Sequence, residues 1–139
     1  MEKKKILVLC TGNSCRSQMA HGFLQQFAED NATVYSAGVE THGVNPLAVR
    51  YMQEAGFNIS HHTSNHLDEY RDIEFDFLIT VCDHAQERCP LYFTKAKTFH
   101  HNFSDPSKKK GNDEEVAQAF RQTRDEIKLY CENWVKDNL

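Results

Sequence analysis

The sequence predicts an α/β fold, with a four-stranded parallel sheet inside a three-layer αβα sandwich. Apolar runs typical of buried strands alternate along the chain with segments whose apolar residues recur at helical spacing. The chain has 139 residues, which suits a single domain over residues 1–139. Because 40% of the residues are hydrophobic, this domain should bury a core without disulfides or a structural metal.

The first predicted unit is a strand, a loop and a helix. Lys5–Cys10 is an unbroken apolar run, typical of a strand that is buried on both faces. The polar loop Thr11–Arg16 follows at once. From about Ser17 to Glu29 the apolar residues recur at helical spacing, and Gly22 is the one weak helix position.

The second unit is again a strand and a helix. Thr33–Ala37 is predicted as a strand that ends at Gly38. Asn45 and Pro46 are typical of an N-cap and a first helical turn, so a helix should follow them. Gly56 is expected to end that helix.

Two more strands and a long helix complete the predicted sandwich. Phe75–Cys82 is the clearer strand, and Ala96–Phe103 is a weaker one. Asn112 and Glu115 resemble a capping box, after which an apolar helix face runs to about Val135. Because strands that alternate with helices imply right-handed crossovers, the four strands should run parallel.

Three reactive side chains are predicted to meet at one edge of this sheet. The first strand ends at Cys10, the third ends at Cys82, and the fourth runs out toward Asp105. Ligands of such sheets bind at the carboxyl ends of the strands. The functional site is therefore expected at that edge.

The loop between the first strand and the first helix is suited to bind an oxyanion. Backbone N–H groups turned inward form an anion nest, the helix dipole adds roughly half a positive charge, and Gly12 permits the tight curl. Arg16 is expected to close the ring with a bidentate guanidinium. The predicted oxyanion-binding residues are Thr11, Gly12, Asn13, Ser14, Cys15, Arg16 and Ser17.

Cys10 lies at the floor of this loop and is the predicted nucleophile. Helix N-termini and neighbouring cations lower a thiol pKa from about 8.5 to roughly 3.5 to 7.5, so Cys10 should be a thiolate. The Ser17 hydroxyl is expected to donate to the same sulfur. Cys15 is expected to shape the loop and Cys131 to fill the core, and neither is expected to react.

Composition and charge exclude several classes of protein. The 16 Lys and Arg against 20 Asp and Glu give a net charge of −4, without the electrostatic footprint of a nucleic-acid binder. The apolar run near the start is too short to span a membrane, and no targeting segment is recognised. Five cysteines, an odd number, do not form a closed disulfide framework. We therefore expect a cytoplasmic protein whose thiols stay reduced unless they react.

The segment Val8–Ser17 resembles the signature loop of the low-molecular-weight protein tyrosine phosphatases and of the arsenate reductases built on the same fold. The resemblance covers nearly the whole chain, because further segments fall where that fold places them: Ser36-Ala37-Gly38, Val81-Cys82-Asp83, Cys89-Pro90 and Asp105-Pro106. It implies a low-molecular-weight phosphatase-like fold. It also implies either the reduction of arsenate or the hydrolysis of phosphate monoesters.

Two further cysteines favour the thioredoxin-coupled arsenate reductases within this family. A hydrolase gains nothing from two more thiols beside its pocket, whereas reduction of arsenate needs two electrons, which thiols supply by forming a disulfide. The resemblance implies that Cys10 attacks arsenic, Arg16 holds the oxyanion and Asp105 protonates the leaving oxygen. It further implies a Cys10–Cys82 disulfide, which Cys89 converts to a Cys82–Cys89 disulfide.

The same resemblance implies the partners. Arsenate is the expected substrate, phosphate and sulfate are competing oxyanions, and thioredoxin is the expected reductant. No cofactor, nucleic acid or membrane partner is expected, and the protein is expected to be a monomer. The physiological role that follows is arsenic detoxification.

A phosphatase that acts on small or peptidyl phosphate esters is the alternative, because Cys10, Arg16 and Asp105 suffice for hydrolysis. Tyrosine phosphatases of this fold typically place an aromatic residue after Asp-Pro, whereas Ser107 and three lysines follow here, so an aromatic substrate is poorly served. Residual phosphatase activity is expected beside reduction. A non-catalytic thiol redox sensor is a third alternative.

Metal sites are not expected. Cys82, His84 and Cys89 lack the paired Cys-x2-Cys spacing of a structural zinc site. In some arsenate reductases of this type, Asn, Glu, Ser and Asp side chains hold potassium, and the matching positions here read Asn13, His21, Ser36 and Asn65. The loss of two carboxylates removes much of the attraction for a hard cation.

The implied relay also predicts a conformational change. If residues 82 to 89 were helical, seven steps of 1.5 Å would place the two cysteine Cα atoms about 10.5 Å apart, against the roughly 4.4 to 6.8 Å that a disulfide allows. Oxidation to a Cys82–Cys89 disulfide should therefore unravel this segment and expose it to thioredoxin.

Overall fold

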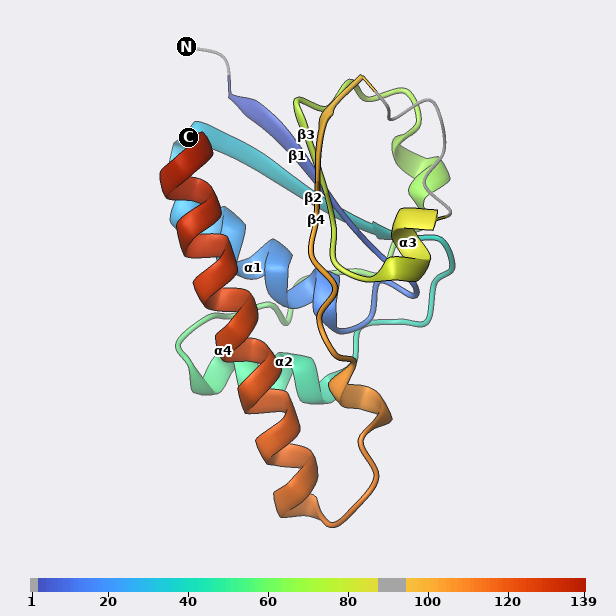
Figure 1. The fold of residues 1–139 in the computed structure, drawn as a ribbon, viewed down its shortest axis with the longest axis vertical. Coiled ribbons are helices and arrows are strands. Elements are labelled where there is room, and N and C mark those ends of the chain that lie inside the picture. Colours follow the sequence, from blue (N-terminus) through green and yellow to red (C-terminus); the bar gives the residue numbers. More distant parts are fainter. Residues whose placement is uncertain (1–2, 88–94) are drawn as a thin grey trace.

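Four parallel strands form one sheet in the computed structural model, which describes residues 3–87 and 95–139. The strand order is β2-β1-β3-β4 (Figure 1). The strands are β1 (Lys4–Cys10), β2 (Ala32–Gly38), β3 (Phe77–Thr80) and β4 (Lys97–His100). Residues 6–9 of the central strand β1 are fully buried, as an apolar run covered on both faces requires. The predicted α/β class and parallel sheet are confirmed.

Helices and short turns lie on both sides of this sheet. The α-helices are α1 (Arg16–Ala28), α2 (Pro46–Glu54), α3 (Asp83–Glu87) and α4 (Asp113–Asn138), and the 3-10 turns are η1 (Glu29–Asn31), η2 (Leu67–Tyr70) and η4 (Pro106–Lys108). On one face lie α1, α2 and α4 (Figure 1). The Trp134 ring of α4 packs on the Phe77 ring of β3. On the other face, Tyr70 and Phe75 pack on Tyr35 of β2, and α3 contacts β1 and β3.

The helix caps and the terminating glycine that the sequence predicted are found in the structure. The Asn45 side chain accepts from the first turn of α2, and Gly56 beyond its end has a φ of 90°, which favours glycine. Asn112 and Glu115 form the expected capping box at the start of α4. This helix continues three residues beyond the expected end, to Asn138.

The predictions for β3 and β4 were too long. The sequence predicted Phe75–Cys82 and Ala96–Phe103, but the hydrogen-bonded strands are the shorter β3 and β4. Phe75 and Phe103 are buried beyond the strand ends, so apolar character continues where the ladder has stopped. Burial and ladder pairing are different properties, and an apolar run reports only burial.

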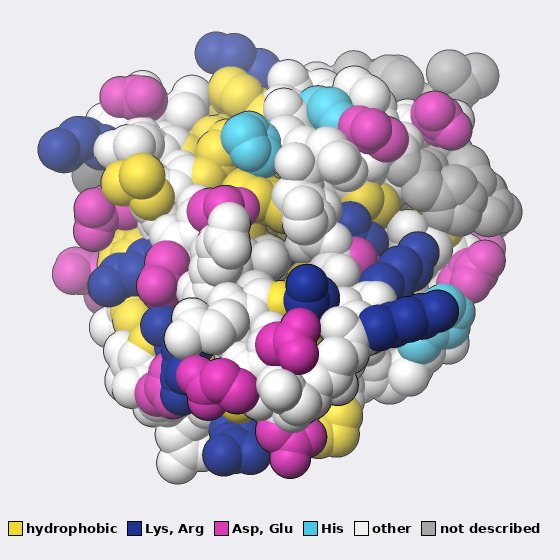
Figure 2. Space-filling model, turned by 60° about the horizontal axis from the view of Figure 1, so that its bottom comes forward, with side chains coloured by type: hydrophobic (Ala, Val, Ile, Leu, Met, Phe, Trp, Pro, Cys, Tyr) yellow, Lys and Arg dark blue, Asp and Glu magenta, His cyan; other side chains and the backbone are white. Residues whose placement is uncertain are grey.

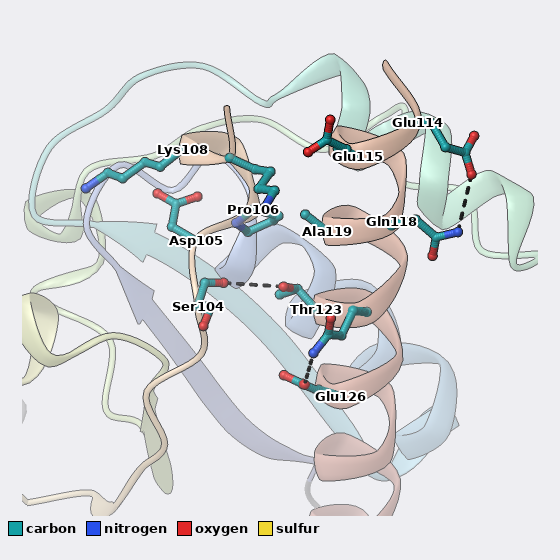
Figure 3. Close-up of a pocket in the computed structure, with 12 residues that line it drawn as sticks. Ser104, Asp105, Pro106, Lys108, Glu114, Glu115, Gln118, Ala119, Thr123 and Glu126 are labelled. Carbon is teal, nitrogen blue, oxygen red and sulfur yellow. Dashed lines mark hydrogen bonds between the residues drawn. The ribbon is translucent and has the colours of Figure 1, made fainter. Parts of the chain in front are cut away.

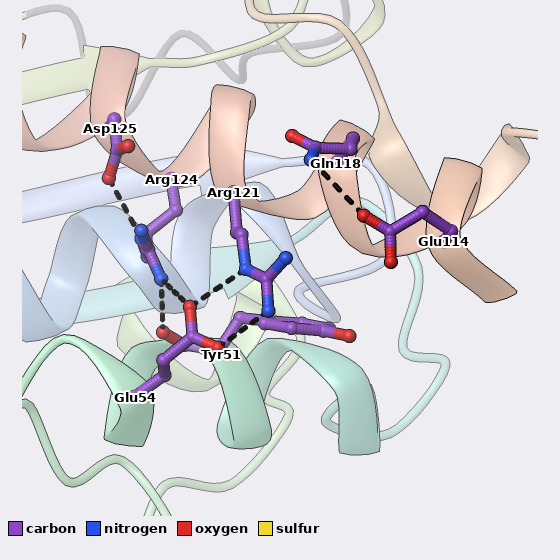
Figure 4. Close-up of polar contacts among 7 residues, drawn as sticks. All are labelled: Tyr51, Glu54, Glu114, Gln118, Arg121, Arg124 and Asp125. Atoms are coloured by element: carbon purple, nitrogen blue, oxygen red, sulfur yellow. Dashed lines mark hydrogen bonds and ion pairs between the residues drawn. The ribbon is translucent and has the colours of Figure 1, made fainter.

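Ion pairs join α2 to α4 (Figure 4). The Glu54 carboxylate accepts hydrogen bonds from Arg121 Nε at 3.0 Å and Nη2 at 2.9 Å, and from Arg124 Nη1 at 2.8 Å. Arg124 also donates to the Tyr51 carbonyl and to Asp125. The bond from Arg121, followed by the bond from Arg124, lowers the pKa of Glu54 to about 2.

The Glu54→Gln variant is expected to lose stability above pH 4.5 and to match the wild type in strong acid. The pKa of Glu54 falls from an ordinary value of 4.5 to about 2 on folding. A carboxylate with a lowered folded pKa contributes stability above its unfolded pKa, and that stability disappears as the pH falls through the folded value. Thermal unfolding should therefore differ between the two proteins at about pH 6 and converge toward about pH 2. A difference that stays constant over this range would contradict the assignment, and Glu126→Gln, at a carboxylate that accepts from Gln122 of the same helix, is the control.

The face shown in Figure 2 carries basic and acidic side chains interspersed with one another. This agrees with a sequence whose charges nearly balance, at a net charge of −4. Within residues 3–87 and 95–139, no helix is both long enough and apolar enough to cross a membrane.

Candidate active site

The loop from Cys10 to Arg16 turns its carbonyl groups outward. Groups outside the loop donate hydrogen bonds to five successive carbonyls of the loop. These bonds run from Val39 N–H to Cys10, Glu40 N–H to Thr11, His42 N–H to Gly12, Gln18 Nε2 to Asn13 and Asn45 N–H to Ser14. The C=O and N–H of a trans peptide point in opposite directions. The N–H groups of residues 11–15 therefore point the other way, toward the inside of the loop, which suits the predicted anion nest.

Asn13 takes the unusual backbone conformation in this loop. Its φ is 49°, in the left-handed region, whereas the φ of Gly12 is not positive, so the expectation that Gly12 supplies the curl was wrong. The buried Asn13 side chain stabilises this conformation, because Nδ2 donates to Ser17 Oγ at 2.8 Å and Oδ1 accepts from Asn65 N–H at 2.7 Å. In the part of the chain that the structure describes, the expected hydrogen bond from the Ser17 hydroxyl to Cys10 is not found, and this hydroxyl accepts from Asn13 Nδ2.

Gly38→Ala is expected to displace the anion-binding loop. A Cβ on Gly38 would meet the Glu40 carbonyl and would lie 2.7 Å from Asn13 N, so backbone atoms would have to move. Overpacking of this kind costs about 1–3 kcal/mol. A Cβ on Gly12 would instead meet the half-exposed His42 side chain, which can swing away, so Gly12→Ala is the matched milder change. Thermal unfolding and phosphate titration should both show the larger loss for Gly38→Ala, and equal losses would count against this explanation.

The thiols of Cys10 and Cys82 lie side by side, as expected for the ends of two adjacent strands. Each thiol shifts the pKa of the other, as expected for neighbouring groups. Cys82 Sγ also lies 3.3 Å from Thr11 Oγ1 and accepts from the Ala85 N–H at 3.4 Å. Cys10 lines the cavity of the site, whereas Cys82 is buried behind it.

The pKa values of the two thiols shift in opposite directions. The interaction with Cys10 lowers the pKa of Cys82 to about 5, assisted by Thr11, the Ala85 N–H and the Arg16 charge. The same interaction, together with burial, raises the pKa of Cys10 against the opposing effects of Arg16 and the Thr11 N–H. In this arrangement the surroundings therefore favour ionisation of Cys82 over ionisation of Cys10, which was the expected thiolate.

Arg16 and Asp105 face each other across the mouth of the loop. Arg16 Nη1 donates to the Phe103 carbonyl at 2.9 Å, and Nη2 lies 3.6 Å from Asp105 Oδ2. The other carboxylate oxygen, Oδ1, accepts from the Ser107 N–H at 3.0 Å and from its hydroxyl at 2.6 Å. One oxygen of Asp105 is thus fixed by Ser107 and the other faces Arg16, in the cavity that the loop residues also line.

A cavity of about 220 Å³ lies above the loop. It is lined by Cys10, Thr11, Gly12, Ser14, Cys15, Arg16, His42, Asp105, Ser107 and Lys108. A larger hollow of about 620 Å³ lies behind the Asp105 segment, against α4 (Figure 3). There Thr123 Oγ1 donates to the Ser104 carbonyl at 3.5 Å, which ties the segment carrying Asp105 to the helix.

The structure brings most of the predicted site residues together. Asn13 and Ser17 are buried and do not line the cavity, and Cys89 lies outside the described residues. Three lining residues were not predicted: His42, Ser107 and Lys108. Ser107 could have been found, because a serine two positions after an aspartate is a common partner for its carboxylate.

The positions considered for potassium are occupied by internal contacts. His21 Nδ1 lies 2.9 Å from Ser36 Oγ, and its ring stacks on His62 with centroids 4.3 Å apart. Burial, and then the neighbouring His62, lower the pKa of His21 to about 3, so the ring is neutral near pH 7. Among the described residues, no group of three or more His, Cys, Asp or Glu is arranged to hold a metal ion.

Known proteins resemble this chain over almost its whole length. The sequence model of the family described as low molecular weight phosphotyrosine protein phosphatase matches residues 5–138. An arsenate reductase of Halalkalibacterium halodurans is 48% identical over 127 residues, which are 91% of each chain. An arsenate reductase of Staphylococcus aureus is 45% identical over 134 residues, 96% of this chain and 98% of its own. A solved arsenate reductase in the phosphate binding state superposes with a TM-score of 0.83 at 30% identity, covering 96% of this chain and 98% of its own.

Proposed function

The chain belongs to the low-molecular-weight phosphotyrosine protein phosphatase family, and we propose that it is an arsenate reductase that converts arsenate to arsenite. The observation that carries this proposal is the proximity of the Cys10 and Cys82 thiols at the ends of the paired strands β1 and β3, where Cys10 also lines the cavity of the site. A hydrolase has no use for a second thiol at that position. The proposal is supported by relatives named arsenate reductase at 45–48% identity.

In the first step, the anion nest and Arg16 bind arsenate. Phosphate and sulfate compete because they present the same tetrahedral oxyanion, and a related arsenate reductase is known in a phosphate binding state. Cys10 passes its proton to Cys82 and attacks As(V). Asp105 protonates the oxygen that leaves as water or hydroxide, while the adjacent Arg16 stabilises the remaining negative charge.

In the second step, Cys82 attacks Cys10 Sγ. Thr11, the Ala85 N–H and the Arg16 charge still lower the pKa of Cys82 after Cys10 has bonded to arsenic, so Cys82 releases the proton it had received to solvent and attacks as a thiolate. The S–S bond forms as the S–As bond breaks, and the electron pair of that bond stays on arsenic, which is reduced from As(V) to As(III). Each of the two sulfurs is oxidised by one electron, and arsenite leaves.

In the third step, the Cys89 thiolate attacks Cys82 and releases Cys10 as a free thiol. The Cys82–Cys89 disulfide is then reduced by the two thiols of thioredoxin, which become a disulfide in turn. We assign the protein to the cytoplasm, because this relay needs a compartment that keeps thiols reduced. We expect a monomer, since Cys10, Cys82, Arg16 and Asp105 all come from one chain.

A change of reductant tests this proposal. Arsenite release should turn over with thioredoxin, thioredoxin reductase and NADPH, and should not turn over with glutaredoxin and glutathione. Turnover with glutaredoxin alone would overturn the assignment of the reductant. Failure with both systems, together with hydrolysis of p-nitrophenyl phosphate, would instead favour the phosphatase alternative.

A further inference from the structure

His100, at the end of β4, connects the two elements that flank Cys82. Its Nδ1 lies 2.6 Å from Thr80 Oγ1 at the end of β3, and its Nε2 lies 2.7 Å from Asp83 Oδ1 at the start of α3. A carboxylate only accepts hydrogen bonds, so the ring donates from Nε2 and, when neutral, accepts the Thr80 hydroxyl at Nδ1. The ring therefore bridges the residue before Val81 and the residue after Cys82.

A second side chain from the same segment holds α3. Asn102 Oδ1 accepts from the Asp83 N–H at 3.1 Å. On its inner side, the first turn of α3 donates to Cys82, because the Ala85 N–H reaches Cys82 Sγ at 3.4 Å. The first turn of α3 is thus fixed to β4 on one side and holds the Cys82 sulfur on the other.

A helix as short as α3 depends on such contacts. It spans five residues, Asp83–Glu87, and isolated helices of this length do not form in water. In α3 the buried Ala85 supplies little apolar area, so the bonds to His100 and Asn102 carry much of its attachment. When these bonds are lost, the helix should fray and release the sulfur.

The hydrogen-bonded series Thr80, His100 and Asp83 has the order of a catalytic triad, which is a nucleophile, a base and a carboxylate. However, Thr80 is fully buried. Its hydroxyl cannot reach a substrate in the cavity, which Thr80 does not line. These three residues therefore position the segment around Cys82 and do not form a second catalytic site.

We propose that His100 and Asn102 are positioning residues that hold α3 against the sheet and thereby keep Cys82 Sγ beside Cys10. This inference rests on the proposed relay, in which Cys82 attacks Cys10. It requires no reactant beyond the two thiols and arsenate. Binding of the oxyanion, which involves the loop after β1, should not depend on these two residues.

Hydrogen exchange tests this inference without any arsenate. His100→Phe keeps an aromatic ring in β4 and removes both hydrogen bonds. His101→Phe is the matched control, because the His101 ring contacts Phe103 and Tyr130 rather than α3. In the reduced protein, the amide of Ala85 should exchange about tenfold faster in His100→Phe, the factor expected for a lost hydrogen bond to a charged group. Equal exchange in His100→Phe, His101→Phe and the wild type would overturn the proposal.

Single-turnover kinetics provide the functional test. In a Cys89→Ser background, the Cys10–Cys82 disulfide should form about tenfold more slowly with His100→Phe, while the affinity for phosphate stays the same. Asn102→Ala should change the rate in the same direction. A parallel loss of phosphate affinity would overturn the proposal, because it would show a general disturbance of the site. If the wild type formed no arsenite at all, the proposed function would fail, and hydrogen exchange alone would decide the role of His100.

Discussion

Replacement of Cys82 by serine is expected to abolish turnover of arsenate while hydrolysis of phosphate monoesters is retained. Reduction requires the disulfide between Cys82 and Cys10, whereas hydrolysis requires Cys10, Arg16 and Asp105. Loss of an essential nucleophile lowers turnover by at least about a thousandfold. Arsenite release with thioredoxin, measured beside p-nitrophenyl phosphate hydrolysis, separates the two activities in one preparation. Cys89→Ser should likewise stop multiple turnovers.

The same variant should lower the pKa of Cys10. The interaction with Cys82 is the largest cause that raises the Cys10 pKa, and the Cys82 charge raises it further. Without Cys82, the charge of Arg16 and the Thr11 N–H should favour the Cys10 thiolate. The pH dependence of alkylation by iodoacetamide reports this pKa, and Cys131→Ala, deep in the core, is the control. Sustained arsenite release by Cys82→Ser would show that reduction does not need Cys82. An unchanged Cys10 pKa would show that Cys82 does not raise it.

Asp105→Asn is expected to lower the turnover of both arsenate and phosphate esters by about 10²- to 10⁴-fold, the usual contribution of a general acid. Phosphate should bind at least as tightly as in the wild type, because Arg16 Nη2 no longer faces a carboxylate 3.6 Å away. The loss should therefore appear in kcat and not in KM. Steady-state kinetics with phosphate inhibition measure the two effects separately.

Ser107→Ala is a milder change that affects the same carboxylate. It removes the 2.6 Å hydrogen bond from the Ser107 hydroxyl to Asp105 Oδ1 and leaves the backbone N–H bond in place. It should cost much less activity than Asp105→Asn, since the carboxyl group itself remains. An Asp105→Asn enzyme with full kcat would show that another group protonates the leaving oxygen.

The features that could be predicted from the sequence are those set by local patterns. The apolar run before Cys10 and the polar loop after it identify a buried strand and its ligand-binding end. The capping signals at Asn45 and Asn112 fix where α2 and α4 begin. Because the strands are parallel, their carboxyl ends meet, and this brought Cys10 and Cys82 together in the prediction as in the structure.

The features that were missed depend on contacts between distant segments. The conformation of the loop is held by donors from residues 39–45, and the loop sequence alone does not show which residue, Gly12 or Asn13, takes the positive φ. The helix α3 is too short to produce a periodic pattern. The opposite pKa shifts of Cys10 and Cys82 arise from their contact, which joins residues far apart in the sequence.

The unravelling of the segment after Cys82 stays a prediction, because Cys89 lies outside the described residues. The helix α3 does begin directly after Cys82, as the distance argument supposed. Amide exchange over residues 83–87 should be slow in the reduced protein and fast once the Cys82–Cys89 disulfide has formed. Unchanged exchange between the two states would count against this step.

A single turnover without any reductant distinguishes the relay from hydrolysis. Reduced enzyme is mixed with excess arsenate, the arsenite is counted, and the disulfides are mapped by mass spectrometry. Two electrons per arsenate predict one arsenite per enzyme molecule and one new disulfide that contains Cys82. Arsenate that remains unreduced, or arsenite formed while Cys82 stays a free thiol, would contradict the three-cysteine relay.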